Sequence, residues 1–192
     1  HRRLGRRAGE DRLRRAARDA GGFGARPKFP RPSQLLFLLR WHHRSGDPAA
    51  LDLVVRTLDA MAAGGIHDHI AGGFHRYAVD DAWRVPHFEK MLYDQALLLR
   101  VYLHAWQITG EARYLQVVDE TIGYVLRDLR HRDGGLCSAE DADSEGEEGK
   151  FYVWSRAEIA EVLGEADAQT FAAAYDVTDA GNWEGHNILN RL

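Results

Sequence analysis

The stretch GGFHRYAVDDAWRVPHFEKMLYDQ, residues 72–95, carries the densest set of chemically capable side chains in the chain. Histidine, arginine, lysine, carboxylate, tyrosine and tryptophan side chains alternate there with apolar ones. A solvated loop has no need of the aromatic residues. A core tolerates the charges only when they are paired, because an unpaired buried charge costs several kcal/mol. The stretch therefore predicts a loop whose polar groups converge on a cleft.

The same stretch carries a helix-start signal. Gly72 and Gly73 indicate a turn, and Pro86 is typical of the first turn of a helix. Apolar residues then recur on more than one side as far as about Ile108, which is typical of a helix buried on two sides. The pattern predicts a long inner helix from Pro86 to about Ile108.

Helical patterns also surround this stretch. Ser33 is the expected N-cap of a helix that ends near Arg44, and Asp47-Pro48 is a strong start for the next helix. Further helices are expected over 114–129, over 155–163 and around 171–175, and short strands are expected at 136–138 and 150–154, on either side of an acidic loop. Gly-Gly turns at 21–23, 72–74 and 134–136 separate the helix pairs. This organisation is typical of stacked αα-hairpins.

Three other stretches strengthen a family resemblance. They are GGFGARPKFPRPSQL from Gly21, SAEDADSEGEEGKFYVW from Ser138 and GNWEG from Gly181. With residues 72–95, they resemble the family of thioredoxin-domain-containing proteins that includes the spermatogenesis-associated proteins. The resemblance implies a thioredoxin-like domain followed by an (α/α) barrel, similar to the barrels of N-acylglucosamine 2-epimerases and six-hairpin glycosidases. We therefore expect an all-α fold, part of an (α/α)6-type barrel of antiparallel helix hairpins, with a short β-hairpin around the acidic loop.

Two segments follow from this expectation. Residues 1–20 form an Arg-rich helix or linker, interpreted as a solvated face because no aromatic residues accompany the arginines. Residues 21–192 form the N-terminal portion of a barrel. The resemblance covers the segment after the thioredoxin-like domain, which implies that this domain belongs to the full-length protein, and no Cys-x-x-Cys motif is present in the sequence. A partial barrel leaves apolar helix flanks uncovered, which predicts self-association of the fragment.

Composition excludes several classes of protein. The net charge is −4 with 28% charged residues, which is ordinary for a globular protein. No apolar run is long enough to span a membrane. The single cysteine, Cys137, excludes an internal disulfide framework. A cytoplasmic location, with neither membrane nor nucleic acid as a partner, is the expectation.

The catalytic candidates come from the opening stretch and the acidic loop. His87, in the first turn of the predicted helix, is expected to stay neutral near the positive helix end and to act as base. Glu89 is the expected acid, because Phe88 and Trp83 would desolvate it and raise its pKa. His75 and Asp141 complete the catalytic set.

A wider set of residues is expected to bind the substrate. Arg76 and Lys90 suit an anionic or enediolate oxygen, although Lys90–Asp94 is equally well interpreted as a helical salt bridge. The remaining binding candidates are Tyr77, Asp80, Trp83, Tyr93, Asp94, Glu140, Asp143, Tyr152, Trp154 and Trp183. Crowded carboxylates divide into acid and base roles in glycosidases. Tyr152 and Trp154 suit stacking on a sugar ring.

Metal binding has weaker support. His67, His69 and His75 have the residue type for zinc, but the only thiol is distant, and no metal site or cofactor is predicted. The acidic loop imitates an EF-hand but carries Tyr152 where the twelfth position requires Glu.

Two functions remain open. The first is a carbohydrate-active barrel protein with a small-molecule, sugar-like substrate. It would act either as an isomerase or epimerase by proton transfer, or as a glycoside hydrolase with paired carboxylates. The alternative is a non-enzymatic or redox-associated scaffold that acts with the thioredoxin-like domain.

Overall fold

The computed structural model describes residues 20–24 and 26–192. The Arg-rich segment predicted for residues 1–20 lies outside this part, apart from its last residue. The helices are α2 (Pro32–Ser45), α3 (Pro48–Ala63), α4 (Leu92–Thr109), α5 (Ala112–Arg127), α6 (Arg156–Leu163) and α7 (Glu165–Ala174). The strands, each of two residues, are β1 (Tyr77–Ala78), β2 (Pro86–His87), β3 (Lys90–Met91), β4 (Ala139–Glu140), β5 (Asp143–Ser144) and β6 (Glu147–Glu148). The described chain is thus predominantly helical.

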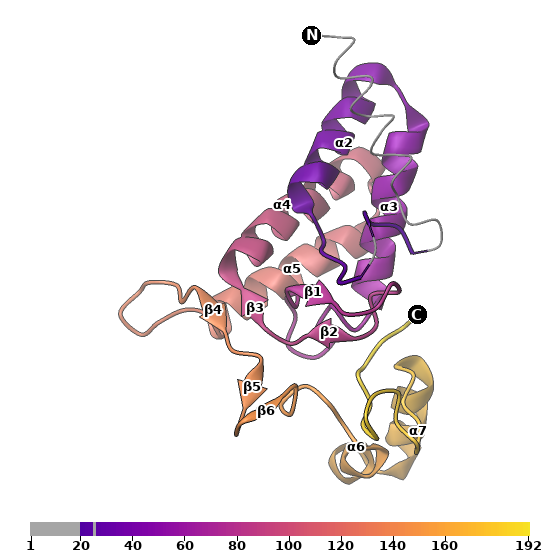
Figure 1. The fold of residues 1–192 in the computed structure, drawn as a ribbon, viewed down its shortest axis with the longest axis vertical. Helices are drawn as coiled ribbons and strands as arrows, with labels where there is room; N and C mark the ends of the chain where they lie inside the picture. Colours follow the sequence, from indigo (N-terminus) through magenta and orange to yellow (C-terminus); the bar gives the residue numbers. More distant parts are fainter. Residues whose placement is uncertain (1–19, 25) are drawn as a thin grey trace.

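Helices α2 to α5 form the main body (Figure 1). Helix α2 packs on α3, α4 packs on α5, and α2 also contacts α4, so that two antiparallel hairpins share one core. Leu38, Leu58 and Val101 are fully buried in it, and the Tyr102 hydroxyl donates to the Leu58 carbonyl at 2.8 Å. Strands β1 to β4 gather at one end of these helices, while α6 and α7 form a smaller lobe beside that end. This arrangement brings the loops and strands together with the ends of the helices at one end of the body.

Local capping signals decide several helix ends. The Asp47 carboxylate accepts from the backbone N–H of Ala49 at 3.1 Å, which confirms the predicted start of α3. Ser155 and Glu158 form the predicted capping box at the start of α6. The expected cap at Ser33 is wrong. Helix α2 begins at Pro32, and its N-cap residue is Arg31, with φ at +49°.

The prediction of a helix from Pro86 is also wrong. Pro86 and His87 form β2, which pairs antiparallel with β1 through Ala78 and Tyr77. Helix α4 begins six residues later, at Leu92. A proline is as compatible with an edge strand as with a first helical turn, so contact with a distant segment decides between them. His87 therefore does not lie at a helix N-terminus.

The acidic loop folds differently from its prediction. The hairpin lies inside the loop, where β5 pairs with β6, rather than between strands at 136–138 and 150–154. Glu145 and Gly146 form its turn, with φ at +55° and +80°. Positive φ at both positions is the geometry of a tight two-residue hairpin turn. Strand β4 pairs instead with β3, so that Lys90 lies opposite Glu140.

The C-terminal lobe has its own small core. Ile159 of α6, Ala168 and Ala172 of α7, and Leu189 are buried together. The buried side chain of Asn187 ties the lobe to its connecting segment by donating to the carbonyls of Trp154 and Thr178, at 3.0 and 3.1 Å. In the part of the chain that the structure describes, none of the helices has the length and apolar character needed to cross a bilayer.

Candidate functional site

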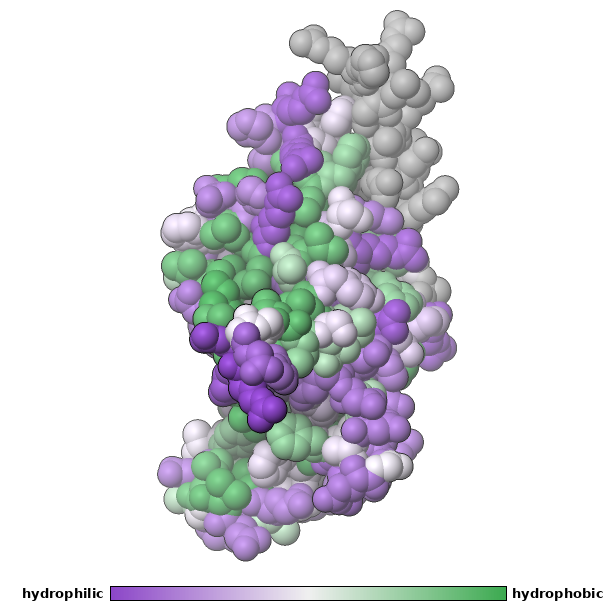
Figure 2. All heavy atoms as spheres, turned by 90° about the vertical axis from the view of Figure 1, so that its left-hand side faces the viewer, coloured by the Kyte–Doolittle hydropathy of each residue, from purple (hydrophilic) through white to green (hydrophobic). Residues whose placement is uncertain are grey.

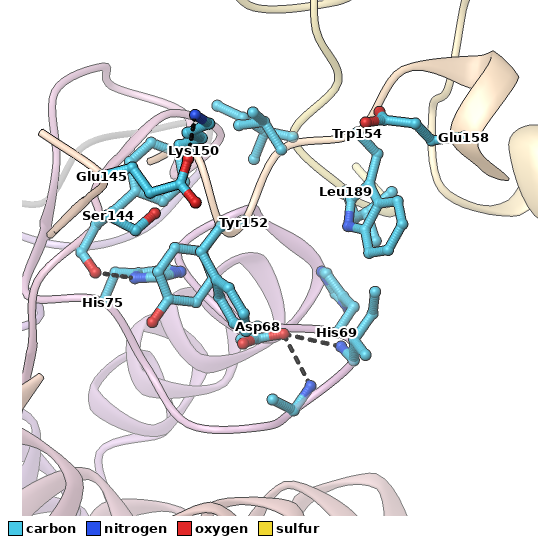
Figure 3. A pocket seen from close by; sticks show the side chains of 16 residues that line it. Asp68, His69, His75, Ser144, Glu145, Lys150, Tyr152, Trp154, Glu158 and Leu189 are labelled. Atoms are coloured by element: carbon cyan, nitrogen blue, oxygen red, sulfur yellow. Dashed lines mark hydrogen bonds and ion pairs between the residues drawn. The ribbon is translucent and has the colours of Figure 1, made fainter. Parts of the chain in front are cut away.

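Two adjoining cavities lie at the strand end of the body, and one of them also reaches the C-terminal lobe at Glu158 and Leu189. Their volumes are about 550 and 620 Å³. Both are lined by Asp68, Ile70, Ala71, Phe151 and Tyr152, and we call the pair of cavities the cleft. Figure 3 shows the smaller cavity, with His75 and Asp68 next to the Tyr152 ring and with Trp154 on the segment that leads into α6. The cleft therefore joins the loop before β1 to the loop after β6.

A buried ion pair holds the wall of the cleft. Lys90 is 1% exposed, and its Nζ lies 2.7 Å from Oδ2 of Asp68. The ammonium also lies over the rings of Tyr124 and Tyr152, at 4.2 and 4.9 Å from their centroids. Burial by itself would raise the pKa of Asp68, but the charge and hydrogen bond of Lys90 lower it to about 2. The Asp68 carboxylate is thus ionised at neutral pH.

His75 presents one free ring nitrogen. Its Nδ1 donates to the carbonyl of Phe88 at 2.8 Å, and among the described residues none hydrogen-bonds its Nε2. Burial, with the nearby Lys90 charge, lowers the pKa of His75 to about 3. The Tyr152 ring meets the imidazole edge-on, at 4.7 Å between centroids. A neutral imidazole with its Nδ1 proton fixed in this way offers a lone pair at Nε2.

Glu140 binds the two tyrosines that flank Lys90. Its Oε2 accepts from the Tyr124 hydroxyl at 2.8 Å, and its Oε1 accepts from the Tyr152 hydroxyl. Burial and the Glu140 carboxylate raise the pKa of both phenols, so they stay protonated as donors. We call Asp68, His75, Lys90, Tyr124, Glu140 and Tyr152 the inner cluster.

A second group of charges surrounds β2 and the start of α4. Arg76 Nη1 donates to Glu89 at 2.9 Å, and His87 Nδ1 lies 2.7 Å from Glu148 Oε1. Asp94 is 8% exposed, and within the described part of the chain its Oδ2 and the Arg76 Nε are buried without hydrogen-bond partners. Burial, with the Glu89 charge, raises the pKa of Asp94 to about 6. We call Arg76, His87, Glu89, Asp94 and Glu148 the outer cluster.

The structure separates residues that the sequence placed in one cleft. His87 and Glu89 belong to the outer cluster and line neither cavity. Because His87 lies in β2, the expectation that a helix end keeps it neutral loses its basis. Glu89 faces Arg76 instead of Trp83, so the expected desolvation by Trp83 is wrong.

Trp83 and Asp80 have structural roles. The Trp83 side chain is fully buried, and its Nε1 donates to the carbonyl of Ala20 at 2.9 Å. The Asp80 carboxylate accepts from the backbone N–H groups of Ala82 and Val85, at 2.6 and 2.5 Å, and so closes the turn between β1 and β2. Neither residue faces the cleft.

The other predicted residues are dispersed. Trp154 lines the cleft with Tyr152, whereas Asp141 and Asp143 are exposed and line neither cavity. Tyr77 stacks on His87 at 4.9 Å, Trp183 packs on Phe88 at 5.6 Å, and Tyr93 is 48% exposed on α4. The acidic loop thus contributes Glu140 to the cleft but not its two aspartates.

Sequence reasoning missed Asp68 and Tyr124. Asp68 lies 22 residues before its partner Lys90. Tyr124 fell within the helix expected over 114–129 and was given no role in the site. The one available signal was that a lysine among apolar residues needs a carboxylate partner. In the described part of the chain, no three His, Cys, Asp or Glu side chains are grouped to hold a metal ion.

Comparison with known proteins adds close sequence relatives. No family model matches the chain. Spermatogenesis-associated protein 20 from Homo sapiens is 44% identical over 84% of this chain and 23% of its own length, and the Mus musculus protein is 43% identical over the same shares. An uncharacterized protein from Caenorhabditis elegans is 39% identical over 84% of this chain and 25% of its own length. The chain therefore spans about a quarter of the relatives it matches.

Solved structures share the fold at low sequence identity. A sugar epimerase from a ruminal bacterium aligns over 84% of this chain and 48% of its own, with a TM-score of 0.61 and 12% identity. Cellobiose 2-epimerase from Spirochaeta thermophila aligns over 73% and 41%, with a TM-score of 0.59 and 18% identity. The Bacillus thermoamylovorans enzyme aligns over 90% and 54%, with a TM-score of 0.61 and 11% identity. The helices thus have the fold of part of an epimerase-like (α/α) barrel, which confirms the predicted fold class at that level.

Proposed function

We propose that the cleft binds a sugar and that the chain is part of a sugar isomerase or epimerase. One observation carries the proposal. His75, whose Nε2 has no hydrogen-bond partner among the described residues, lines a cavity of about 550 Å³ together with Tyr152 and Trp154. Aromatic faces beside a few fixed polar groups form the usual lining of a small-molecule site. The fold shared with sugar epimerases supports the proposal.

The roles of individual groups follow from their charge states. The Lys90 ammonium, which lines the larger cavity of the cleft, is the group that we assign to the carbonyl oxygen of the sugar. Because its pKa is about 3, His75 is a poor proton carrier at neutral pH, so we assign it a hydrogen bond from a sugar hydroxyl. His87 and Glu89 line neither cavity and have no chemical role in this proposal.

The hydrolase alternative has less support. A glycosidase needs two carboxylates on opposite sides of the scissile bond. Both oxygens of Glu140 already accept from tyrosine hydroxyls, and Asp141 and Asp143 are exposed outside the cavities. From the family resemblance we also propose a thioredoxin-like domain as partner.

The test is a titration of the chain with monosaccharides and disaccharides, followed by NMR. We expect saturable binding by at least one sugar, weakened at least tenfold, or about 1.4 kcal/mol, in His75→Phe. His87→Gln is the matched control and should bind as the wild type does. Absence of binding at 100 mM sugar, or equal losses in the two variants, would refute the proposal.

Isotope exchange in the full-length protein distinguishes the reactions. An isomerase or epimerase in D₂O incorporates deuterium at the carbon next to the carbonyl, whereas a hydrolase releases a new reducing end without exchange. We expect exchange, and we expect His87→Gln to retain it. Sugar binding with neither reaction would contradict the enzymatic part of the proposal and favour a binding scaffold.

A further inference from the structure

A third cavity, of about 380 Å³, opens between α3 and α5. It shares His69 with the cleft but none of the inner cluster. The volume exceeds that of several water molecules, since one water takes about 30 Å³ of the liquid. The proposed sugar site makes no use of this cavity.

His67 is one of the residues that line this cavity. Its side chain is 4% exposed, and both Nδ1 and Nε2 are buried without a hydrogen-bond partner among the described residues. Oε2 of Glu120 lies 3.5 Å from Nε2, but the geometry there is not that of a hydrogen bond. Leaving a buried polar group unpaired costs about 1–3 kcal/mol, so such a group calls for a partner that the protein itself does not supply.

The charges around the cavity favour a neutral partner. Asp59 and Glu120 balance Arg113 and Arg191 on its walls. Arg113 already binds Asp59 at 2.9 Å, and Glu120 accepts from Gln116 at 2.7 Å. Burial lowers the pKa of His67 to about 3, so the imidazole adds no charge at neutral pH.

A hydroxyl group matches these requirements. A neutral imidazole offers one donor and one acceptor, and a hydroxyl supplies the complement of either. Tyr114 and Tyr175 contribute aromatic surface to the same walls, which suits the carbon skeleton of a ring. We infer that this cavity is a second binding site, for a small neutral polyhydroxylated molecule that hydrogen-bonds to His67.

The test uses myo-inositol, a neutral cyclic polyol, and reads the ring nitrogen signals of His67 by NMR in the whole chain. We expect a saturable shift at His67 and none at His104, which lines none of the three cavities. His75→Phe, which alters the cleft, should leave the shift unchanged, so that failure of the proposed sugar site does not affect this result. Sodium acetate and methylammonium chloride, as charged probes, should give no saturable shift.

Two variants complete the experiment. His67→Leu removes both nitrogens at similar volume, and Ala62→Phe places a ring in the cavity wall. We expect each to lower the affinity for myo-inositol at least tenfold while the chain stays folded by circular dichroism. If His67→Leu fails to fold, Ala62→Phe decides. Unchanged affinity in a folded variant, no saturable shift at 100 mM myo-inositol, or a response to acetate instead, would overturn the inference.

Discussion

The Lys90–Asp68 pair of the inner cluster and the Arg76–Glu89 pair of the outer cluster contain the same kinds of charged group but differ in their access to water. In the inner cluster Lys90 is 1% exposed and Asp68 is 9% exposed. In the outer cluster Arg76 is 39% exposed and Glu89 is 25% exposed. Desolvation makes a buried pair costly to break, whereas solvent screens a half-exposed pair. Two ion pairs of similar composition are therefore expected to contribute differently to the free energy of unfolding.

The difference also bears on function. The inner cluster borders cavities and fixes its charge states through short contacts, as a binding site requires. The outer cluster lines neither cavity of the cleft, although it leaves Arg76 Nε and Asp94 Oδ2 unpaired. The dense polar stretch of residues 72–95 thus serves two surfaces, of which only the inner one borders the proposed sugar site.

The largest expected effect is that of breaking the inner ion pair. Lys90→Met leaves the Asp68 carboxylate buried without its cation, which should lower the free energy of unfolding by about 3–5 kcal/mol. Arg76→Met, the matched change in the outer cluster, should cost less than about 1 kcal/mol. Urea unfolding at pH 7 measures both. Similar losses in the two variants would remove the energetic distinction between the clusters.

The next largest loss of stability is expected from substituting a glycine, and we compare Gly73, which contacts the inner cluster, with Gly146, which lies two residues before Glu148 of the outer cluster. Gly73 has φ at +79°, and an added Cβ would lie 2.6 Å from Cδ1 of the inner residue Tyr124. Gly146 has φ at +80°, with nothing within 4 Å of the added atom. Gly73→Ala should cost about 2–4 kcal/mol from backbone strain and overpacking together. Gly146→Ala should cost about 1–2 kcal/mol from strain alone. Equal thermal shifts would show that the Tyr124 ring moves aside freely.

Local signals predicted much of the helical frame. Asp47 and the Ser155 capping box mark helix starts by contacts within three residues, which a sequence shows directly. The family resemblance extended these helices to a barrel. The described chain follows that expectation because its helix hairpins pack with apolar faces that the sequence periodicity also shows.

Local sequence patterns did not predict the contacts between segments that are far apart in the sequence. The role of Pro86 depends on its pairing with Ala78, and the role of Lys90 depends on Asp68. The sequence shows that Ala78 and Asp68 are present, but it does not show that they lie next to Pro86 and Lys90 in the fold. The candidate site was therefore predicted as one cleft, because sequence proximity could not reveal which side chains of residues 72–95 face inward.

Asp94 of the outer cluster and His75 of the inner cluster should change the stability of the chain with pH in opposite directions. Asp94 has its pKa raised to about 6 from 3.8, so between these values the folded chain holds a proton that the unfolded chain has released. Its contribution to stability therefore falls as the pH rises from about 4 to 6. His75, with its pKa lowered to about 3, acts oppositely, since the unfolded chain gains a proton below about pH 6.5 and stability falls toward acid.

Asp94→Asn isolates the outer contribution. The variant resembles protonated Asp94 at every pH, so it should be more stable than the wild type by about 2–3 kcal/mol at pH 8 and unchanged at pH 3. Urea unfolding across pH 3–8 gives the difference between the two curves. A constant difference over that range would show that Asp94 does not hold a proton in the folded chain.

The smallest expected effect tests single hydroxyl groups in the two regions. Tyr124 donates to Glu140 at 2.8 Å in the inner cluster. Tyr77 stacks beside the outer cluster at 4.9 Å from His87, and the structure gives its hydroxyl no hydrogen bond among the described residues. Tyr124→Phe should lower the free energy of unfolding by about 1.5–3 kcal/mol, because its acceptor is a carboxylate, while Tyr77→Phe should stay within about 0.5 kcal/mol of the wild type. A loss for Tyr124→Phe that matched the Tyr77→Phe value would mean that Tyr152 and water satisfy Glu140 without it, and that the inner cluster is held by the Lys90–Asp68 pair alone.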